Sequence, residues 1–286
     1  MKFYGNSGMV RQVSLGVALR STSITNFGIG EMMSSYPSSV TIYGQEYTFR
    51  RILKDDFFSL NILYANPSKE GYVLKLSDFR FVCGWMFRPL AAWISKREYT
   101  IYQMVEDISG IPDLGPRYGK RGYFHQYIEG KTLYECQDNK VLPRDFFDQL
   151  LVIVDQVHQR RIFYADLNKR GNIICSTTGK AYLIDFQICV PFKSCTGKLG
   201  AWVDRIFRCL VQEDQYHVLK HKKFFQRELM SREEQAGVQR SSLNEWYGQW
   251  VWRPYVTLKR LIYPHGSNET IWYKWKQEKD QSPRMP

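Results

Sequence analysis

The sequence predicts an α+β protein, in which a strand-rich first half is followed by a mainly helical second half. Short runs rich in β-branched and aromatic residues, separated by turns, occupy residues 47–76. Apolar residues recur at three- and four-residue steps within residues 144–161. This order predicts a small antiparallel sheet, a connector near Glu129 and a helical region, with a ligand site between the two parts.

The individual elements follow from local patterns. A hairpin turn is expected at residues 66–71, Asn-Pro-Ser-Lys-Glu-Gly, because Asn, Pro and Gly punctuate the chain there. A helix is expected before the break at residues 110–112, Gly-Ile-Pro. The expected strands are residues 47–53, 59–65, 72–76 and 123–128, and the expected helices are residues 93–108, 144–161, 202–221 and 243–261.

The two ends of the chain differ from its middle in composition. The first 39 residues hold eight Ser, five Gly and a single acid, Glu31, which is typical of a mobile leader. A transit peptide is the alternative, and the low Arg content disfavours it. We therefore expect a leader (residues 1–39), an N-terminal lobe (40–128), a C-terminal lobe (129–263) and a polar tail (264–286).

Charge and cysteine content limit the classes of partner and compartment. The formal net charge is +12, which favours anionic partners such as nucleotides, phosphorylated sugars or lipid surfaces. The six cysteines form no CxxC pair, which disfavours a structural zinc site. Because no signal peptide and no apolar window of about 20 residues is evident, we expect a cytoplasmic protein with reduced thiols.

One ordered set of polar residues points to chemistry. Asp166 and Asn172 share one loop, and Asp185 follows an apolar run, Tyr-Leu-Ile, at residues 182–184. Two carboxylates and an amide are oxygen ligands suited to a magnesium ion that bridges phosphates. The alternatives are a capping Asp at position 166 and a buried structural Asp at position 185.

This set resembles the protein-kinase-like superfamily, in its atypical bacterial branches: lipopolysaccharide-kinase-like, RIO-type and small Ser/Thr-kinase-like proteins. The resemblance covers about residues 45–225 and implies a two-lobed fold with a small antiparallel-sheet N-terminal lobe and a mainly helical C-terminal lobe. It implies an ATP- and Mg²⁺-dependent kinase that moves the γ-phosphoryl group to a hydroxyl.

The resemblance also implies a role for each matching residue. Asp166 would position the acceptor hydroxyl, while Asn172 and Asp185 would hold magnesium. Lys75, in the run Tyr-Val-Leu-Lys-Leu, would pair with the nucleotide phosphates, and a solvent-facing edge lysine is the alternative. The implied helical partner of Lys75 is Glu98, with Glu106 as the competitor, and Glu129 would frame the adenine pocket.

The sequence departs from the family pattern at four places. Asn172 lies six rather than five positions after Asp166, so an extra residue is expected to bulge at Gly171; Asn168 is the second metal candidate. Tyr164-Ala165 replaces the usual His-Arg and leaves Tyr164 as a packing residue. Gln187 replaces the glycine after Asp-Phe, and no glycine occurs at residues 54–59. These departures favour the alternative of a pseudokinase-like nucleotide-binding or scaffold module.

The acceptor is the least specified part of the prediction. Only a short segment, without an A-P-E motif, separates Asp185 from Asp204, and the loop is flanked by Lys169 and Arg170. A saccharide or lipid-linked sugar of anionic character, which a basic pocket mouth favours, is preferred narrowly over a protein Ser/Thr. A RIO-like, RNA- or ribosome-associated kinase is a further alternative, disfavoured because no aromatic RNA-binding motif occurs.

A basic and aromatic stretch lies at residues 81–94. Its Trp, Phe, Met and Leu residues stand beside Arg88, Lys96 and Arg97. We favour a buried approach to a core helix, with peripheral contact to an anionic surface at the inner face of a membrane as the alternative.

Overall fold

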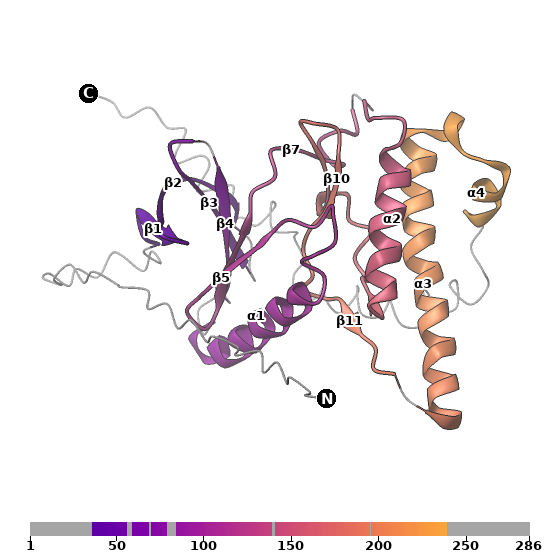
Figure 1. Cartoon of the computed structure of the whole chain (residues 1–286), viewed down its shortest axis with the longest axis horizontal. Helices are drawn as coiled ribbons and strands as arrows, with labels where there is room; N and C mark the ends of the chain where they lie inside the picture. Colours follow the sequence, from indigo (N-terminus) through magenta and orange to yellow (C-terminus); the bar gives the residue numbers. More distant parts are fainter. Residues whose placement is uncertain are drawn as a thin grey trace, which may run out of the picture.

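The computed structural model describes residues 36–55, 59–68, 70–78, 84–138, 141–194 and 196–238. It is an α+β protein, with a curled antiparallel sheet and helix α1 at one side of Figure 1 and helices α2 and α3 at the other. Most of the predicted leader, the predicted helix at residues 243–261 and the tail lie outside the described residues. No helix among the described residues is long and apolar enough to cross a membrane.

The main sheet has six strands in the order β1-β2-β3-β4-β6-β5, and every neighbouring pair is antiparallel. The prediction of residues 59–65 as a strand is confirmed, and residues 72–76 fall inside β4. The prediction of 123–128 runs two residues too far. The strands are β1 (Ser39–Ile42), β2 (Gln45–Asp55), β3 (Ser59–Ala65), β4 (Gly71–Ser77), β5 (Leu114–Tyr118) and β6 (Gly122–Gln126).

Two tight turns fix the register of the sheet. Tyr43 and Gly44 both have positive φ, 50° and 82°, as a two-residue primed hairpin between β1 and β2 requires. Between β3 and β4, the Asn66 amide N–H donates to the Glu70 carbonyl at 3.0 Å, and the Asn66 side chain accepts from the Glu70 N–H at 2.9 Å. The predicted hairpin turn after β3 is confirmed.

Helix α1 (Arg88–Gln103) packs beside the sheet and follows a short 3₁₀ turn, η1 (Gly84–Phe87). The helix begins and ends five residues earlier than the expected bounds, 93–108. Pro89 fits the first helical turn, and residues 104–109 form turns instead. Its buried residues recur at helical spacing, so one face is committed to the interior. They are Ala91, Ser95, Glu98, Ile101 and Tyr102.

The second half combines helices with two small sheets. Strands β7, β9 and β10 form one antiparallel sheet, and β8 pairs with β11. The predicted helix at 144–161 is close to α2, whereas α3 extends beyond the expected 202–221 at both ends. The elements are β7 (Gly130–Thr132), α2 (Phe146–Gln159), β8 (Ile162–Phe163), β9 (Ile173–Ser176), β10 (Ala181–Leu183), β11 (Val190–Pro191), α3 (Gly197–Phe225), η3 (Arg227–Leu229) and α4 (Arg232–Gly237).

Helices α2 and α3 run antiparallel, side by side (Figure 1). Phe147 near the start of α2 packs against Phe225 at the end of α3, with ring centroids 6.2 Å apart. Near the other end of α2, His158 meets Asp214 in the middle of α3. This pair of helices is the support on which the loop after β8 rests.

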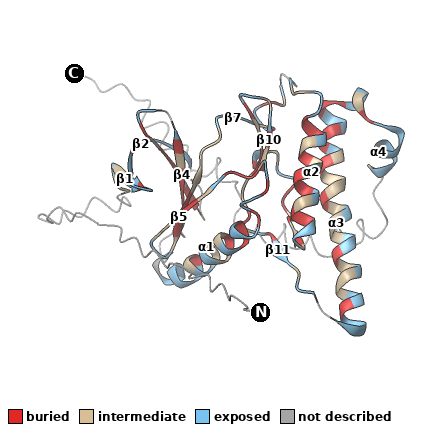
Figure 2. Cartoon of the chain, in the orientation of Figure 1, coloured by how far each residue is buried: buried red, intermediate tan, exposed pale blue. Residues whose placement is uncertain are grey.

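Buried side chains form two clusters, which Figure 2 shows in red on the sheet and between the helices. The smaller cluster belongs to the sheet and includes Tyr64 and Leu74. The larger cluster joins α2, α3 and the small sheets, and it reaches into α1 through Ile101 and Tyr102. Helix α1 therefore belongs to the larger core as much as to the sheet beside it.

Candidate functional site

Lys75 is a buried cation in the middle of the six-stranded sheet. It lies on β4, opposite Asn61 on β3 and Tyr123 on β6, and only 4% of it is exposed. A buried ammonium group is stable only with anionic partners. Its Nζ lies 2.6 Å from Glu98 Oε1 and 2.8 Å from Asp185 Oδ1. The alternative of a solvent-facing lysine is wrong, because β4 is a central strand with neighbours on both edges.

Glu98 reaches Lys75 from the buried face of α1. Its position seven residues after Ala91 places it on the same face as the apolar contacts of the helix. Burial raises the pKa of the Glu98 carboxyl, and the nearby Lys75 ammonium opposes that rise. The competitor, Glu106, is exposed on the turns that follow α1 and takes no part in this pair.

Asp185, which follows β10 in the second half of the chain, is the second anionic partner of Lys75. Burial alone would lower the pKa of Lys75 and raise that of Asp185, but their mutual attraction outweighs it. The pKa of Lys75 is therefore raised and that of Asp185 is held well below its usual range. Both groups stay charged at neutral pH, so the site holds a fixed cation between two carboxyl groups.

The backbone at Asp185 is turned into the left-handed region, with φ of 69°. It follows β10 directly, and the next residue, Phe186, is fully buried against Tyr102 and Tyr164, with ring centroids 5.0 and 5.5 Å away. The Tyr164 hydroxyl donates to the Ile184 carbonyl. The prediction that Tyr164 acts as a packing residue is confirmed, and the buried ring of Phe186 anchors the carboxylate beside Lys75.

Asp166 and Asn172 meet despite the extra residue between them. Asn172 Nδ2 lies 3.0 Å from Asp166 Oδ2 and 3.4 Å from the Asp166 carbonyl oxygen. The loop absorbs the additional residue in the short 3₁₀ turn η2 (Arg170–Asn172), with the Asn172 N–H bonded to the Lys169 carbonyl at 3.1 Å. Gly171 lies within this turn, in open surroundings and without a positive φ, so the turn does not depend on the dihedral freedom of glycine.

A lysine shields the Asp166 carboxylate. Lys169 Nζ lies 2.5 Å from Asp166 Oδ2, and its side chain is 58% exposed. Burial raises the pKa of Asp166, while Lys169 lowers it. Asn168, the second metal candidate, points elsewhere: it is exposed and accepts a hydrogen bond from Lys220 on α3 at 3.1 Å. The structure therefore selects Asn172 rather than Asn168 as the amide of this site.

Asp214 holds the loop before Asp166 in place, and sequence reasoning missed it. Its fully buried carboxylate accepts the backbone N–H groups of Tyr164 at 2.9 Å and Ala165 at 3.2 Å, and it contacts His158 Nε2 at 3.0 Å. Ala165 has φ of 70°, a strained conformation that these bonds stabilise. No local pattern marks Asp214, because its partners lie about 50 residues earlier in the chain.

A pocket of about 450 Å³ is lined by Lys75, Asn172 and Asp185, whereas Asp166 lies beside it and is not among its lining residues. Four cationic side chains line it, Lys54, Lys75, Lys169 and Arg170, against one carboxylate, Asp185. Such a surplus of positive charge suits a polyanionic ligand. The remaining lining residues are Asn61, Tyr102, Tyr123, His125, Tyr134, Gly171, Asn172 and Ile184.

Asn61 and Arg170, which both line the pocket, have features that suit ligand binding. Asn61 Oδ1 is buried and has no hydrogen-bond partner among the described residues, which is costly unless a ligand supplies one. Arg170 is held in place, with its guanidinium 3.9 Å from the centroid of the Phe224 ring and 3.2 Å from Gln137 Oε1. Sequence reasoning missed Asn61 and Lys54, since neither belongs to a motif.

Glu129 does not line this pocket. It is exposed between β6 and β7 and borders a separate pocket of about 420 Å³, together with Tyr127, Cys136 and Cys175. Its backbone carbonyl accepts the Thr177 N–H at 2.9 Å. Glu129 is therefore not among the lining residues of the pocket that holds Lys75, and its place beside an adenine ring stays a prediction.

Arg97, next to Glu98, ties α1 to the segment that follows Asp185. Its guanidinium donates to the carbonyl oxygens of Gln187 at 2.9 Å and Cys189 at 2.5 Å. Gln187 stands where the Asp-Phe-Gly pattern has its glycine, and Arg97 holds it through its backbone carbonyl. Arg97 thus holds the segment after Asp185 directly, while Glu98 acts on Asp185 only through Lys75.

The donor set fits a hard divalent cation. Asp185 and Asn172 both line the pocket and offer carboxylate and amide oxygens, which suit magnesium completed by phosphate oxygens and waters. Among the residues that the structure describes, no group of three or more His, Cys, Asp or Glu side chains forms a protein-only metal cage. Comparison of the chain with protein-family models and with curated protein sequences found no match.

Proposed function

We propose that this protein is a phosphotransferase with a two-lobed, protein-kinase-like arrangement, in which the described residues of the expected lobes, 40–128 and 129–263, surround the pocket of Lys75. The observation that carries the proposal is the buried Lys75 bridged to Glu98 and Asp185, opposite the linked pair Asp166 and Asn172. A structural ion pair alone would not need the cation-lined pocket above it.

Each side chain has one physical task in this proposal. Lys75, oriented by Glu98, and Lys54 attract the phosphate oxygens, while Asp185 and Asn172 supply the oxygen ligands for Mg²⁺. When bound, ATP would supply the phosphoryl group, and Mg²⁺ would neutralise part of the negative charge on its phosphates. Asp166 orients the acceptor hydroxyl and accepts its proton, and its raised pKa suits that exchange.

The acceptor that we propose is a small hydroxyl compound with anionic character, a saccharide or lipid-linked sugar ahead of a protein Ser/Thr. Residues 186–196 alone join Asp185 to α3, which leaves little chain for holding an extended peptide. Arg170 lies on the side of the pocket nearest α3, through its contact with Phe224, and offers a charge for such an acceptor.

Nucleotide binding tests the proposal directly. Calorimetry should show that the full chain binds Mg-ATP, and that Asp185→Asn abolishes binding while leaving the fold intact. Asp107→Asn, the same change at a residue whose side chain is 63% exposed and paired with Arg160, is the matched control and should bind as wild type. A wild-type protein that binds no nucleotide overturns the proposal.

A second candidate is a pseudokinase-like nucleotide-binding module. Two features favour it: the ion pair with Lys169, which occupies the Asp166 carboxylate, and the lack of glycine at residues 54–59. The two functions differ in the behaviour of Asp166→Asn. In an enzyme this variant should bind Mg-ATP normally and lose roughly 10²–10⁴-fold in phosphoryl transfer or ATP hydrolysis. Wild-type binding without any turnover supports the module instead.

A further inference from the structure

Large apolar side chains are exposed along the outer face of α1 and the preceding turn η1. Met86 and Trp93 are 61% and 60% exposed, and Phe87 and Leu90 are 41% and 44% exposed. Met86, Leu90 and Trp93 follow one another at four- and three-residue steps, so they share one face. The expectation that this stretch is a buried approach to a core helix is therefore wrong for these four side chains, whereas Ala91 in the same stretch is buried.

A second apolar cluster lies at the start of α3 and on the segment leading to it. Leu199 and Trp202 are 63% and 61% exposed, and Ile188 and Val190 near β11 are 43% and 39% exposed. Figure 1 shows α1, β11 and the first turns of α3 along the same lower edge of the molecule.

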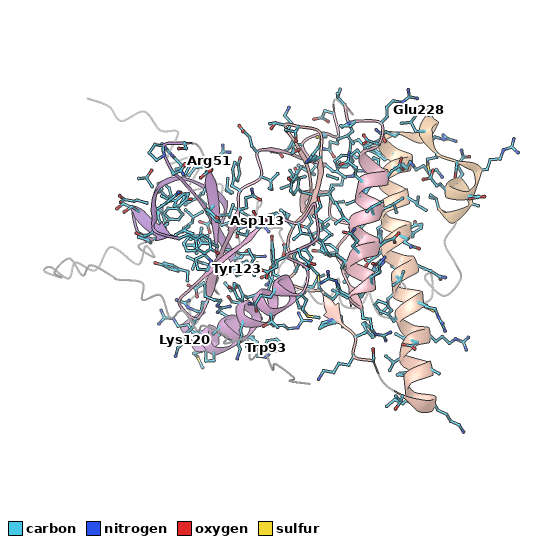
Figure 3. The ribbon with its side chains drawn as sticks, in the orientation of Figure 1. Arg51, Trp93, Asp113, Lys120, Tyr123 and Glu228 are labelled. Carbon is cyan, nitrogen blue, oxygen red and sulfur yellow. The ribbon has the colours of Figure 1, made fainter. Side chains whose placement is uncertain are left out.

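The edge is also basic. Arg88 and Lys96 are exposed on α1, and Lys198 and Arg205 are exposed at the start of α3. The acidic residues of α1 and of the first turns of α3 are each paired with a cation. Glu98 is buried against Lys75, and Asp204 Oδ1 lies 2.6 Å from Arg161 Nη2. Figure 3 shows Trp93 at this edge, with Lys120 of the β5–β6 turn near the same end of α1.

We propose that this edge, defined by Met86, Leu90, Trp93, Leu199 and Trp202 with their flanking cations, docks on an anionic membrane surface. Tryptophan settles at the boundary between lipid chains and headgroups, and lysine and arginine attract acidic headgroups. Two tryptophan-bearing clusters at separate points of one edge suit a flat, extended partner. The contact is peripheral, through side chains only, and it is independent of the phosphotransferase proposal.

Vesicle co-sedimentation with the full chain tests this inference. The protein should bind vesicles of phosphatidylcholine mixed with phosphatidylglycerol, bind phosphatidylcholine alone far less, and dissociate as salt is raised. The double variant Trp93→Ala/Trp202→Ala should lose binding to the mixed vesicles. Equal binding to both vesicle types, or none to the mixed vesicles, overturns the inference.

Charge reversals locate the surface. Arg88→Glu and Lys198→Glu should each weaken binding to the mixed vesicles, by at least about fivefold for each positive charge removed. Arg227→Glu and Arg232→Glu make the same change at exposed cations of η3 and α4, at the opposite edge of the molecule in Figure 1, and should bind as wild type. Equal losses in both sets mean attraction by net charge alone and overturn the assignment to this edge.

Self-association is the remaining outcome to exclude. Analytical ultracentrifugation without lipid should show the same oligomeric state for wild type and for the double tryptophan variant. A dimer that disappears in that variant, together with absent vesicle binding, would assign the edge to a second copy of the chain. Circular dichroism spectra that match wild type confirm that each variant is folded.

Discussion

Asp185 carries two demands that few residues can satisfy together. Its carboxylate must remain charged beside Lys75, and its backbone must adopt φ of 69°. Asn tolerates this backbone region better than other non-glycine residues, whereas Ala gains nothing from it. Replacing Asp185 by Asn removes the charge alone, whereas replacing it by Ala also adds backbone strain, so comparing the two variants separates these effects.

We expect Asp185→Ala to be less stable than Asp185→Asn by at least about 1 kcal/mol, because Ala adds left-handed strain to the lost carboxylate. Urea unfolding of the two variants, followed by tryptophan fluorescence, measures the difference. Neither variant should bind Mg-ATP. Equal unfolding midpoints would show that the turn relaxes and that the backbone at residue 185 is not strained.

His221 is a residue-scale source of pH dependence. It is buried on α3 with Nε2 2.8 Å from the Leu167 carbonyl oxygen, and burial, followed by the positive charge of Arg170, lowers its pKa to about 4. The unfolded chain takes up a proton near the ordinary value of 6.5, while the folded protein does not. Stability is therefore lost as pH falls from about 6.5 towards 4.

Replacing this histidine should flatten the pH dependence. His221→Gln keeps a side-chain donor for the Leu167 carbonyl but does not titrate, so its stability should fall less between pH 7 and pH 5. Over this interval the difference between the two proteins should stay within about 2 kcal/mol, because only the part of the pKa shift between 6.5 and 5 is titrated. Thermal melts at several pH values measure it. If stability falls equally with pH in wild type and variant, His221 is not the source of this pH dependence.

At the scale of elements, α1 is joined to the turn at Asp185 by Arg97. The guanidinium crosses from the helix to two carbonyl groups about 90 residues later in the chain. If α1 moved away from the helical core, Glu98 would leave Lys75 at the same time. Arg97 is thus a positioning residue, which acts on the site through the helix that carries it.

We expect Arg97→Ala to lower kcat for phosphoryl transfer by about tenfold, with a smaller effect on the KM for ATP, and to cost about 2 kcal/mol of stability through two charge-assisted hydrogen bonds. Thr100→Ala, on the exposed face of the same helix, is the control and should leave both constants unchanged. Arg97→Lys should restore part of kcat. A loss of stability with no change in kcat would make Arg97 purely structural.

The strands and the site differ in how far the sequence predicts them. β3 and β4 are mainly apolar or aromatic runs, interrupted by Asn61 and Lys75, and the turn at Asn66 separates them, so their pattern is local. β1 was missed because its hairpin uses Tyr43 with Gly44 rather than the usual Asn-Gly. Lys75, Asp166 and Asp185 carry recognisable neighbours, whereas Asp214, Asn61 and Arg97 act through contacts that only the folded chain creates.

At the scale of the whole molecule, the pocket joins the two cores. Lys54, Asn61 and Lys75 reach it from the six-stranded sheet, while Lys169 and Asn172 reach it from the loop after β8. The aromatic cluster in the sheet and the larger helical core are separate, and a ligand in the pocket touches strands and loops of both sides. Binding should therefore stabilise the molecule as one unit.

We expect Mg-ATP at a hundredfold excess over its Kd to raise the free energy of unfolding by about 2.7 kcal/mol, because the ligand binds the folded chain alone. Differential scanning calorimetry should show a higher Tm, with sheet and helical core unfolding in a single transition. Adenosine with Mg²⁺ should give a much smaller shift, because it lacks the phosphates that the four cations lining the pocket would attract. A shift of equal size with adenosine would place the binding energy in the base and contradict the role assigned to Lys54, Lys75, Lys169 and Arg170.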